Sequence, residues 1–181
     1  MTKSGAEAVE IVDSKGLVTA IATRQEMRDR VLRHRAASVV VLAKNRISSQ
    51  LELVVHQRSP EKDVYPLYWD VAFGGVCDVG ETWIEAAQRE LAEEAGVNDV
   101  ELLELGQDSY EDEQVSVVGR VFVAVHPGPF SFVDGEVIQV DRVPVVGINF
   151  DQWLNSHQVC DDSLAITVPL IKKYFSDQEG D

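Results

Sequence analysis

The sequence predicts a domain of the α/β (α+β) class, in which a mixed β-sheet lies between helices. The apolar run at 36–43, AASVVVLA, is typical of a strand that is buried on both faces. A strong helix signal spans residues 82–96, where a capping residue opens the pattern and a glycine closes it. The other strand and helix signals do not alternate strictly along the chain. Such an order favours a mixed sheet with helices on both faces over a purely parallel sheet.

The length of the chain fits a single domain. We expect one domain over residues 1–181, in which an N-terminal hairpin and helix (about 9–33) lead into a core (about 34–176). A chain of this size buries roughly 70% of its unfolded surface on folding, so it needs no disulfide bonds for stability. Cys77 and Cys160 lie far apart and lack the spacing of a metal site, which suits the reducing cytoplasm.

Charge and hydropathy argue against two classes of partner. The chain carries 16 basic and 31 acidic side chains, so its net charge is −15. Such a charge repels a nucleic-acid polymer, although a metal ion and a few arginines can still attract a small phosphorylated ligand. No apolar run approaches the roughly 20 residues that cross a bilayer, and the first ten residues lack the apolar centre of a signal peptide. We therefore expect a cytoplasmic protein that binds a small molecule and neither nucleic acid nor a membrane.

Turn, strand and helix signals divide the rest of the chain into short elements. A hairpin is predicted at 9–22, and Thr23 with Glu26 forms a capping box that opens an arginine-rich helix to about Arg33. Strand signals also lie at 51–57, 69–73, 99–105, 115–125 and 137–146, and helix signals lie at 150–154 and from Asp162 or Ser163 to about Phe175.

The helix near residue 90 has clear ends and an apolar stripe. Thr82 and Glu85 form a capping box, so the helix should begin near Trp83, after a turn at Gly74-Gly75. Gly96 should end it, because glycine adopts the left-handed conformation that closes helices. At about 100° per residue, one apolar stripe is formed by Ile84, Ala87, Leu91 and Ala95.

Three glutamates on the same helix violate two local preferences. Glu90, Glu93 and Glu94 form a second stripe, and like charges at this spacing repel by a few tenths of a kcal/mol per pair. They also lie in the last turns of the helix, where the macrodipole is negative and favours cations. Two violations in one turn indicate that the segment binds a cation. Hard oxygen ligands favour Mg²⁺, with Mn²⁺ as a second candidate.

The same stretch resembles the Nudix box, the signature of the Nudix hydrolases. Gly75 is followed by five residues and Glu81, and then by seven residues and the run RELAEEAGV at 89–97, with no departure at a fixed position. The resemblance implies an α/β/α sandwich with a mixed β-sheet between helices. It also implies hydrolysis of a nucleoside diphosphate linked to another moiety, with magnesium as the cofactor.

The resemblance assigns roles to individual residues. Arg89 would pair with a carboxylate of the motif, such as Glu81, and fix its orientation. Chemistry agrees with a metal site, because divalent ions neutralise phosphate charge and lower the pKa of the attacking water. The metal ligands implied are the carboxylates of Glu90, Glu93 and Glu94 and the carbonyl of Gly74.

Residues outside the motif are similar to the Nudix branch that includes isopentenyl-diphosphate isomerase and its hydrolase-like relatives. Counted from Trp69, the active-site cysteine of the isomerase would fall at Gly74 and its metal-binding histidine at Val76, so both are missing. Isomerisation needs a side chain that delivers a proton to carbon, and hydrolysis is therefore preferred. An isomerase-like enzyme and a non-catalytic ligand-binding module are the alternatives. The similar segments are 32–36, 57–59 with Lys62, 68–70 and 111–113.

Further charged residues are candidates for substrate binding and proton transfer. Arg58 and Lys62 match positions that contact diphosphate in the isomerase-like branch, and an ordinary basic loop is the alternative. Glu93 or a loop glutamate would act as the general base. Glu113 and Glu111 are loop candidates for this base or for a further metal ligand, and a solvated acidic hairpin is the alternative interpretation. Glu136 is the second choice for the base.

Two remaining features have structural interpretations. His34 matches a metal-binding histidine of the isomerase, but its companion seven residues earlier is Met27, so a structural role is favoured. The N-terminal hairpin and helix offer a surface for a homodimer contact.

Overall fold

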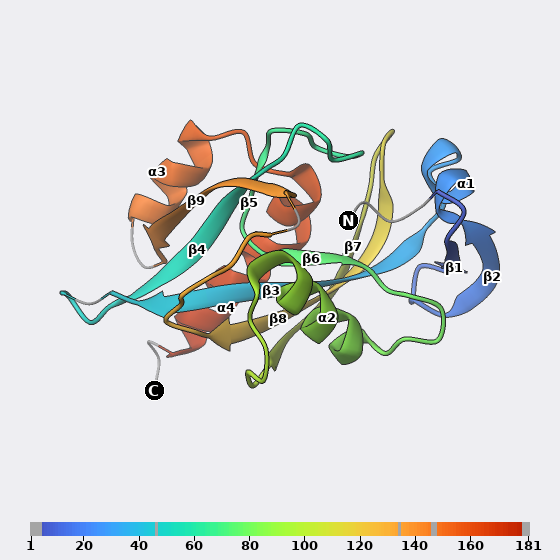
Figure 1. The fold of residues 1–181 in the computed structure, drawn as a ribbon. Helices are drawn as coiled ribbons and strands as arrows, with labels where there is room; N and C mark the ends of the chain where they lie inside the picture. Colours follow the sequence, from blue (N-terminus) through green and yellow to red (C-terminus); the bar gives the residue numbers. More distant parts are fainter. Residues whose placement is uncertain (1–4, 46, 134, 146–147, 179–181) are drawn as a thin grey trace.

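The fold is organised around one long central strand, β3 (His34–Lys44). The computed structural model describes residues 5–45, 47–133, 135–145 and 148–178 (Figure 1). Strand β3 pairs in parallel with β8 (Ser116–Val125) along one edge. Three shorter segments share its other edge in antiparallel pairings, and these are β1 (Ala8–Val12), β6 (Phe73–Val76) and β4 (Leu51–Arg58).

The outer strands extend this arrangement on both sides. Strand β2 (Val18–Thr23) pairs with β1, and β7 (Leu103–Glu111) pairs with β8. Strand β4 leaves the central strand and pairs with β5 (Trp69–Asp70) and β9 (Val137–Pro144). Within the described residues, nine strands thus form one mixed sheet, as the sequence predicts.

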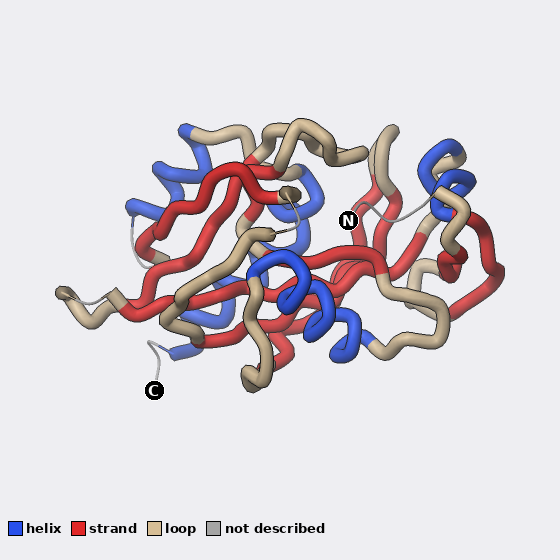
Figure 2. The backbone as a smooth tube through the Cα atoms, viewed as in Figure 1, coloured by secondary structure: helices blue, strands red, loops and turns tan. Residues whose placement is uncertain are grey.

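Helices cover both faces of the sheet (Figure 2). The side chains of β3 alternate between the two faces. Val39 and Val41 pack on the side of α2 (Trp83–Ala95), whereas Val40 and Leu42 pack on the opposite side. That opposite side is covered by α3 (Ile148–Ser156), the π-helical turn η1 (Ser163–Thr167) and α4 (Val168–Gln178). The α/β/α arrangement is therefore confirmed.

The short helix α1 (Arg24–Asp29) lies at the end of the molecule beside the N-terminal hairpin (Figure 1). Both reciprocal bonds of its capping box are present between Thr23 and Glu26. Its buried residue, Met27, packs with Val9 of β1 and Val76 of β6 in a small third cluster. This packing fixes the orientation of α1 toward the middle of the molecule.

Several predicted boundaries are wrong by a few residues. Helix α1 ends at Asp29 instead of Arg33, because Arg30 leaves the helical conformation and Val31 has a positive φ of 48°. Residues 99–102 form no strand, and β7 begins at Leu103 and continues through Glu111. The predicted strand 69–73 is divided between β5 and β6. Val146, which the last strand signal includes, lies outside the described residues.

Gly74 and Gly75 lie inside β6 and form no turn, which corrects the sequence-based expectation. A Cβ atom on Gly74 would lie 2.2 Å from the backbone oxygen of Ala37, and one on Gly75 would lie 2.7 Å from the carboxylate carbon of Glu90. Both distances are far below van der Waals contact. Glycine at these positions therefore allows β6 to lie close to both β3 and α2.

The buried face of α2 also differs from the predicted stripe. Ala87, Leu91 and Ala95 are buried as expected, but Ile84 is 43% exposed. Ala86 is buried in its place, together with the two carboxylates at positions 90 and 94. The face that α2 turns to the sheet is therefore rotated toward its glutamates.

Among the described residues, no helix combines the length and the apolar character that are required to span a membrane.

Candidate active site

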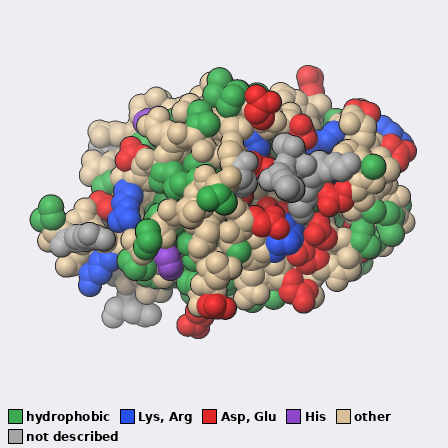
Figure 3. Space-filling view, viewed as in Figure 1, with side chains coloured by type: hydrophobic (Ala, Val, Ile, Leu, Met, Phe, Trp, Pro, Cys, Tyr) green, Lys and Arg blue, Asp and Glu red, His purple; other side chains and the backbone are tan. Residues whose placement is uncertain are grey.

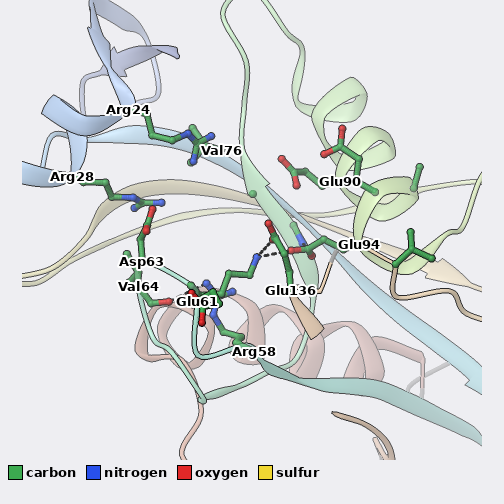
Figure 4. Close-up of a pocket in the computed structure, with 16 residues that line it drawn as sticks. Arg24, Arg28, Arg58, Glu61, Asp63, Val64, Val76, Glu90, Glu94 and Glu136 are labelled. Carbon is green, nitrogen blue, oxygen red and sulfur yellow. Dashed lines mark hydrogen bonds and ion pairs between the residues drawn. The ribbon is translucent and has the colours of Figure 1, made fainter. Parts of the chain in front are cut away.

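A cavity of about 800 Å³ lies between α2 and β6 on one side and α1 and the loop after β4 on the other. Figure 4 shows Glu90 and Glu94 on one wall and Arg24 and Arg28 on the wall opposite. Its carboxylates are Glu61, Asp63, Glu90, Glu93, Glu94 and Glu136, and its cations are Arg24, Arg28, Arg58 and Lys62. Acidic and basic side chains also gather near the middle of the face shown in Figure 3.

The helix α2 places two of its three predicted metal ligands deep in this cavity. Glu90 and Glu94 are one turn apart, and they are only 7% and 3% exposed. The capping box of Thr82 and Glu85 fixes the start of the helix, and Gly96, with φ of 67°, ends it as predicted. Glu93 lies at the cavity wall, with its side chain 52% exposed.

Glu94 is the most constrained carboxylate of the site. Its Oε2 accepts a hydrogen bond from the backbone N–H of Gly74 at 2.9 Å, and its Oε1 accepts one from Nζ of Lys62 at 3.0 Å. Burial raises the pKa of Glu94 to about 7; the nearby charge of Glu90 acts in the same direction, and Lys62 opposes it. Loss of its cationic partner would therefore leave a charge that is expensive to maintain.

Lys62 joins two carboxylates that come from different parts of the chain. It donates a hydrogen bond to Glu94 on α2 and another to Glu136, the residue just before β9 (Figure 4). Burial lowers the pKa of this lysine, but the two carboxylates outweigh burial and raise the pKa overall. Lys62 thus acts as the counter-ion of the acidic wall.

Arg89 holds the carboxylates of the motif in place. It donates from Nε and NH2 to the two oxygens of Glu81, both at 2.9 Å, and from NH1 to Glu90 at 2.5 Å. Burial lowers the pKa of Arg89, but the hydrogen bonds that it donates to Glu81 and Glu90, and the charges of these carboxylates, raise it overall. The same NH1 also lies 3.4 Å from a carboxylate oxygen of Glu93. The contact with Glu81 is the one that the sequence motif led us to expect.

Arg58 lines the cavity from its floor. Its NH1 lies 3.4 Å from a carboxylate oxygen of Asp70, and its NH2 donates to the carbonyl of Val64 at 3.0 Å. Burial lowers the pKa of this guanidinium, but the nearby acidic groups, with Asp70 first and Glu94 and Asp162 among the others, together raise it, so the group stays protonated. The structure therefore brings both predicted substrate-binding cations, Arg58 and Lys62, to the same cavity as the glutamates.

The donor groups fit a hard divalent cation, although they are not arranged as a ready cage. Among the described residues, no group of three His, Cys, Asp or Glu side chains has the geometry of a metal site. Instead, the carboxylate oxygens accept hydrogen bonds from cationic side chains, with Lys62 donating to Glu94 and Arg89 donating to Glu90. Two adjacent buried carboxylates are the donor set that Mg²⁺ or Mn²⁺ prefers. Gly74 contacts Glu94 through its N–H, and metal binding by its carbonyl stays a prediction.

The structure does not bring Glu113 to this cavity. Glu113 is exposed in the turn between β7 and β8 and is not among the residues that line the cavity. Glu111 pairs with Arg33 and accepts a hydrogen bond from the hydroxyl of Ser116 at 3.1 Å. Glu136, the second loop candidate, does line the cavity. Strand order explains this difference between Glu136 and Glu113. Strand β9 pairs with β4, so its first residues face α2, whereas the β7–β8 turn extends past the sheet.

Sequence reasoning missed the two arginines of α1 that line the cavity. Arg24 and Arg28 are four residues apart, so they share one face of the helix. The i,i+4 pair of arginines in an otherwise acidic chain was the available signal.

Two other residues have structural roles, and for His34 this is the role that the sequence favours. His34 is 3% exposed, its Nδ1 lies 3.0 Å from the carbonyl of Leu32, and burial lowers its pKa to about 4. Cys77 packs in the core under α2, where burial raises the pKa of its thiol to about 12.

Comparison with known proteins agrees with this geometry. The sequence matches the family model of the NUDIX domain over residues 32–165. The chain belongs to the Nudix hydrolase family. It is 38% identical over 134 residues to an uncharacterized Nudix hydrolase of Yersinia pestis, a match that covers 74% of this chain and 71% of that protein. It is 37% identical over 134 residues to the uncharacterized Nudix hydrolase YfcD of Escherichia coli K12, covering 74% and 72%. Membership makes the protein a hydrolase of diphosphate bonds, in a family that uses divalent cations.

Solved structures show the same Nudix fold. The crystal structure of DR0079 from Deinococcus radiodurans superposes with a TM-score of 0.72 at 21% identity, over 92% of this chain and 98% of that one. The NUDIX domain of NrtR from Shewanella oneidensis, in complex with ADP ribose, superposes with a TM-score of 0.62 at 17% identity, over 79% and 88%.

The buried charge of Glu94 predicts a pH-dependent effect of Glu94→Gln on stability. The folded-state pKa, about 7, lies above the ordinary value of 4.5, so the stability of the wild type falls as pH rises through this window. Glutamine does not ionise, so the variant does not lose stability in this way as pH rises. Lys62 keeps Glu136 as a hydrogen-bond partner in the variant. With a chelator present, the melting temperature of the variant relative to the wild type should therefore rise between about pH 5 and pH 8.

The exposed Glu101→Gln serves as the control and should show a constant difference over the same range. A constant difference for Glu94→Gln as well would contradict a buried, partly protonated carboxylate at this position.

Proposed function

We propose that the protein is a Mg²⁺-dependent hydrolase that cleaves a diphosphate linkage in a nucleoside diphosphate derivative or a related small molecule. The observation that carries this proposal is the cavity in which two buried carboxylates, Glu90 and Glu94, face a wall of cations. The acidic wall suits divalent cations, and the basic wall suits the phosphate oxygens of the substrate. The bound ADP ribose of the Shewanella domain supports a nucleoside diphosphate derivative as the ligand class.

The proposed metal ligands are Glu90, Glu93, Glu94 and the carbonyl of Gly74, as in the motif. A divalent cation, either Mg²⁺ or Mn²⁺, would neutralise the diphosphate and make water a better nucleophile. The protein contributes rigid placement, because Arg89 ties Glu90 to Glu81 and the N–H of Gly74 fixes Glu94.

The proposed phosphate ligands are Arg58 and Lys62. Both line the cavity, and arginine can contact two phosphate oxygens at once whereas lysine acts as a point charge. Lys62 is engaged with Glu94 and Glu136 in the structure. It becomes available to phosphate oxygens once its carboxylate partners have another counter-ion.

For the general base we propose Glu93, with Glu136 as the alternative. Glu93 is partly exposed at the cavity wall, so water and its proton have access to it. Glu136 faces the cavity from the other side but is held by Lys62. Glu113 would need the β7–β8 turn to move toward the cavity.

The two alternatives are less compatible with the site. An isomerase needs an acid at position 74 or close to it, but Gly74 has no side chain and Val76 packs against Val9 and Met27. Cys77 lies in the core, where burial raises its pKa to about 12, so it is poorly placed to transfer protons at the cavity. A non-catalytic binding module would have no need for three carboxylates in this arrangement.

We predict that Glu94→Gln lowers Mg²⁺-dependent hydrolysis by roughly 100-fold or more, since it removes a negative ligand while it keeps the size of the side chain. The measurement is turnover on a panel of nucleoside diphosphate derivatives and prenyl diphosphates, with products identified by mass. Glu101→Gln should retain wild-type turnover.

Near-normal hydrolysis by Glu94→Gln would reject the metal assignment. An allylic isomer without phosphate release would favour the isomerase, and ligand binding without turnover across the panel would favour the binding module.

We further propose one Nudix domain over the whole chain and a cytoplasmic location. The family model begins at residue 32, which supports an N-terminal hairpin and helix (about 9–33) ahead of the core (about 34–176). Both cysteines are buried free thiols, which supports a reducing compartment.

We also propose that two copies associate through the edge of β2. This strand ends the sheet, and its neighbourhood exposes Leu17, Val18 and Ile21 by 63%, 52% and 61%. Apolar side chains gather at this end of the molecule in Figure 3. Such an edge is a template for strand pairing. Light scattering should give the mass of a dimer for the wild type and of a monomer for Ile21→Lys, and a monomeric wild type would contradict the proposal.

A further inference from the structure

The wall of the cavity opposite the glutamates is made by two arginines that the proposed chemistry does not use. Arg24 and Arg28 extend from α1 into the cavity and lie across from Glu90 and Glu94 in Figure 4. Their spacing places two like charges side by side on a helix of only six residues, where they repel by a few tenths of a kcal/mol. The arrangement is locally unfavourable, as is common where a protein binds a ligand.

These arginines are poorly satisfied within the protein. Nε of Arg24 lies 3.4 Å from a carboxylate oxygen of Glu7, but neither atom has a hydrogen-bond partner. No carboxylate of the described residues lies within ion-pair distance of Arg28, and its buried Nε has no hydrogen-bond partner. Desolvation and the charge of Arg24 both lower the pKa of Arg28, and Asp63 partly offsets them. An anion between the two guanidinium groups would relieve this cost.

The chemistry of the cavity indicates which kind of anion fits. Among the described residues that line it none is aromatic, so the cavity holds a ligand mainly through charged groups and not through stacking. Its volume of about 800 Å³ is suited to a ligand much larger than a bare diphosphate. Paired arginines bind phosphate through parallel hydrogen bonds, and phosphate is also the anion that this family handles.

Helix α1, which carries this wall, lies outside the part of the chain that matches the family model. The match to the NUDIX domain model begins at residue 32, after α1 has ended at Asp29. Arg58 at the end of β4 and Lys62 in the loop that follows lie on a different segment, and they serve the diphosphate in the proposed function. The arginine wall is therefore an addition that the N-terminal segment of this chain makes to the cavity.

We propose that Arg24 and Arg28 form a second anion subsite, which binds a phosphomonoester carried by the group attached to the diphosphate. The identity of the first subsite rests on the proposed function, whereas the arginine subsite itself rests on the geometry of α1. The substrate class is then a diphosphate derivative with an additional terminal phosphate, in preference to its otherwise identical counterpart without that phosphate.

Matched ligand pairs test this subsite. Coenzyme A and dephospho-coenzyme A share one diphosphate and differ by one phosphate, and NADP⁺ and NAD⁺ do likewise. ADP-ribose and its 2′-phosphate form a third pair. Dissociation constants for all six are measured by calorimetry with the full chain, without metal and with Ca²⁺. The wild type should bind the phosphorylated member of at least one pair about tenfold more tightly, as expected for charge-assisted hydrogen bonds.

Variants of α1 identify the residues responsible. Arg28→Gln should weaken the phosphorylated member about tenfold more than its counterpart, and Arg28→Lys should give an intermediate ratio because it keeps the charge without the planar fork. Arg30→Gln is the matched control, since Arg30 is 65% exposed and pairs with Glu26 on the surface. Melting curves verify folding, and Arg24→Gln provides an independent variant in case Arg28→Gln does not fold.

Equal affinity within every pair for the wild type would overturn the proposal, and so would an equal loss for both members in Arg28→Gln. Hydrolysis of the same six compounds is measured in parallel with Mg²⁺. A phosphate preference in binding without hydrolysis would support the subsite and reject the proposed function. Hydrolysis without any preference would reject only the subsite.

Discussion

The buried contact between Glu94 and Lys62 is the interaction on which the rest of the site depends. A carboxylate that is 3% exposed requires a cation beside it, because an unpaired charge at this depth costs several kcal/mol. Lys62 meets this requirement from the loop after β4, and its second contact, with Glu136, ties the start of β9 to the same point. The acidic wall is thus built to hold positive charge, whether it comes from a lysine or from a metal.

The sheet positions this contact through the way its strands share β3. Strand β6 pairs with residues 36–39 of β3, and β4 pairs with residues 42–44. Strands β6 and β4 therefore occupy successive parts of the same edge of β3. Gly75 in β6 lets α2 approach this strand closely enough for Glu90 and Glu94 to face inward. The loop after β4 and helix α1 then complete the cavity from the other side. The charges of the site come from four separate segments that only the tertiary fold brings together.

Local patterns were sufficient to predict the elements that carry the motif. The capping box at Thr82 and the stop at Gly96 could be expected from spacing, and the contact between Arg89 and Glu81 from the resemblance to the Nudix box. The apolar stripe was wrong at Ile84, because periodicity treats carboxylates as solvent-facing, whereas α2 turns two of them inward. Such an inversion is visible in a sequence only as a violation of charge preferences, which is how the site was recognised.

The remaining parts of the site depend on distant contacts that no local pattern encodes. Glu136 reaches the cavity because β9 pairs with β4, and Glu113 stays outside because the β7–β8 hairpin extends beyond the sheet. The arginines of α1 reach the cavity because Met27 docks the helix against Val9 and Val76. Each of these placements follows from strand order and packing, which a single sequence leaves open.

The most direct test of the account is the position of a divalent cation in crystals soaked with Mn²⁺, located by its anomalous scattering. We expect Mn²⁺ to be bound by the carboxylates of Glu90 and Glu94, with Nζ of Lys62 moved away from Glu94. A manganese ion bound elsewhere, or one bound while Lys62 keeps its hydrogen bond to Glu94, would contradict the claim that Lys62 holds the place of the metal.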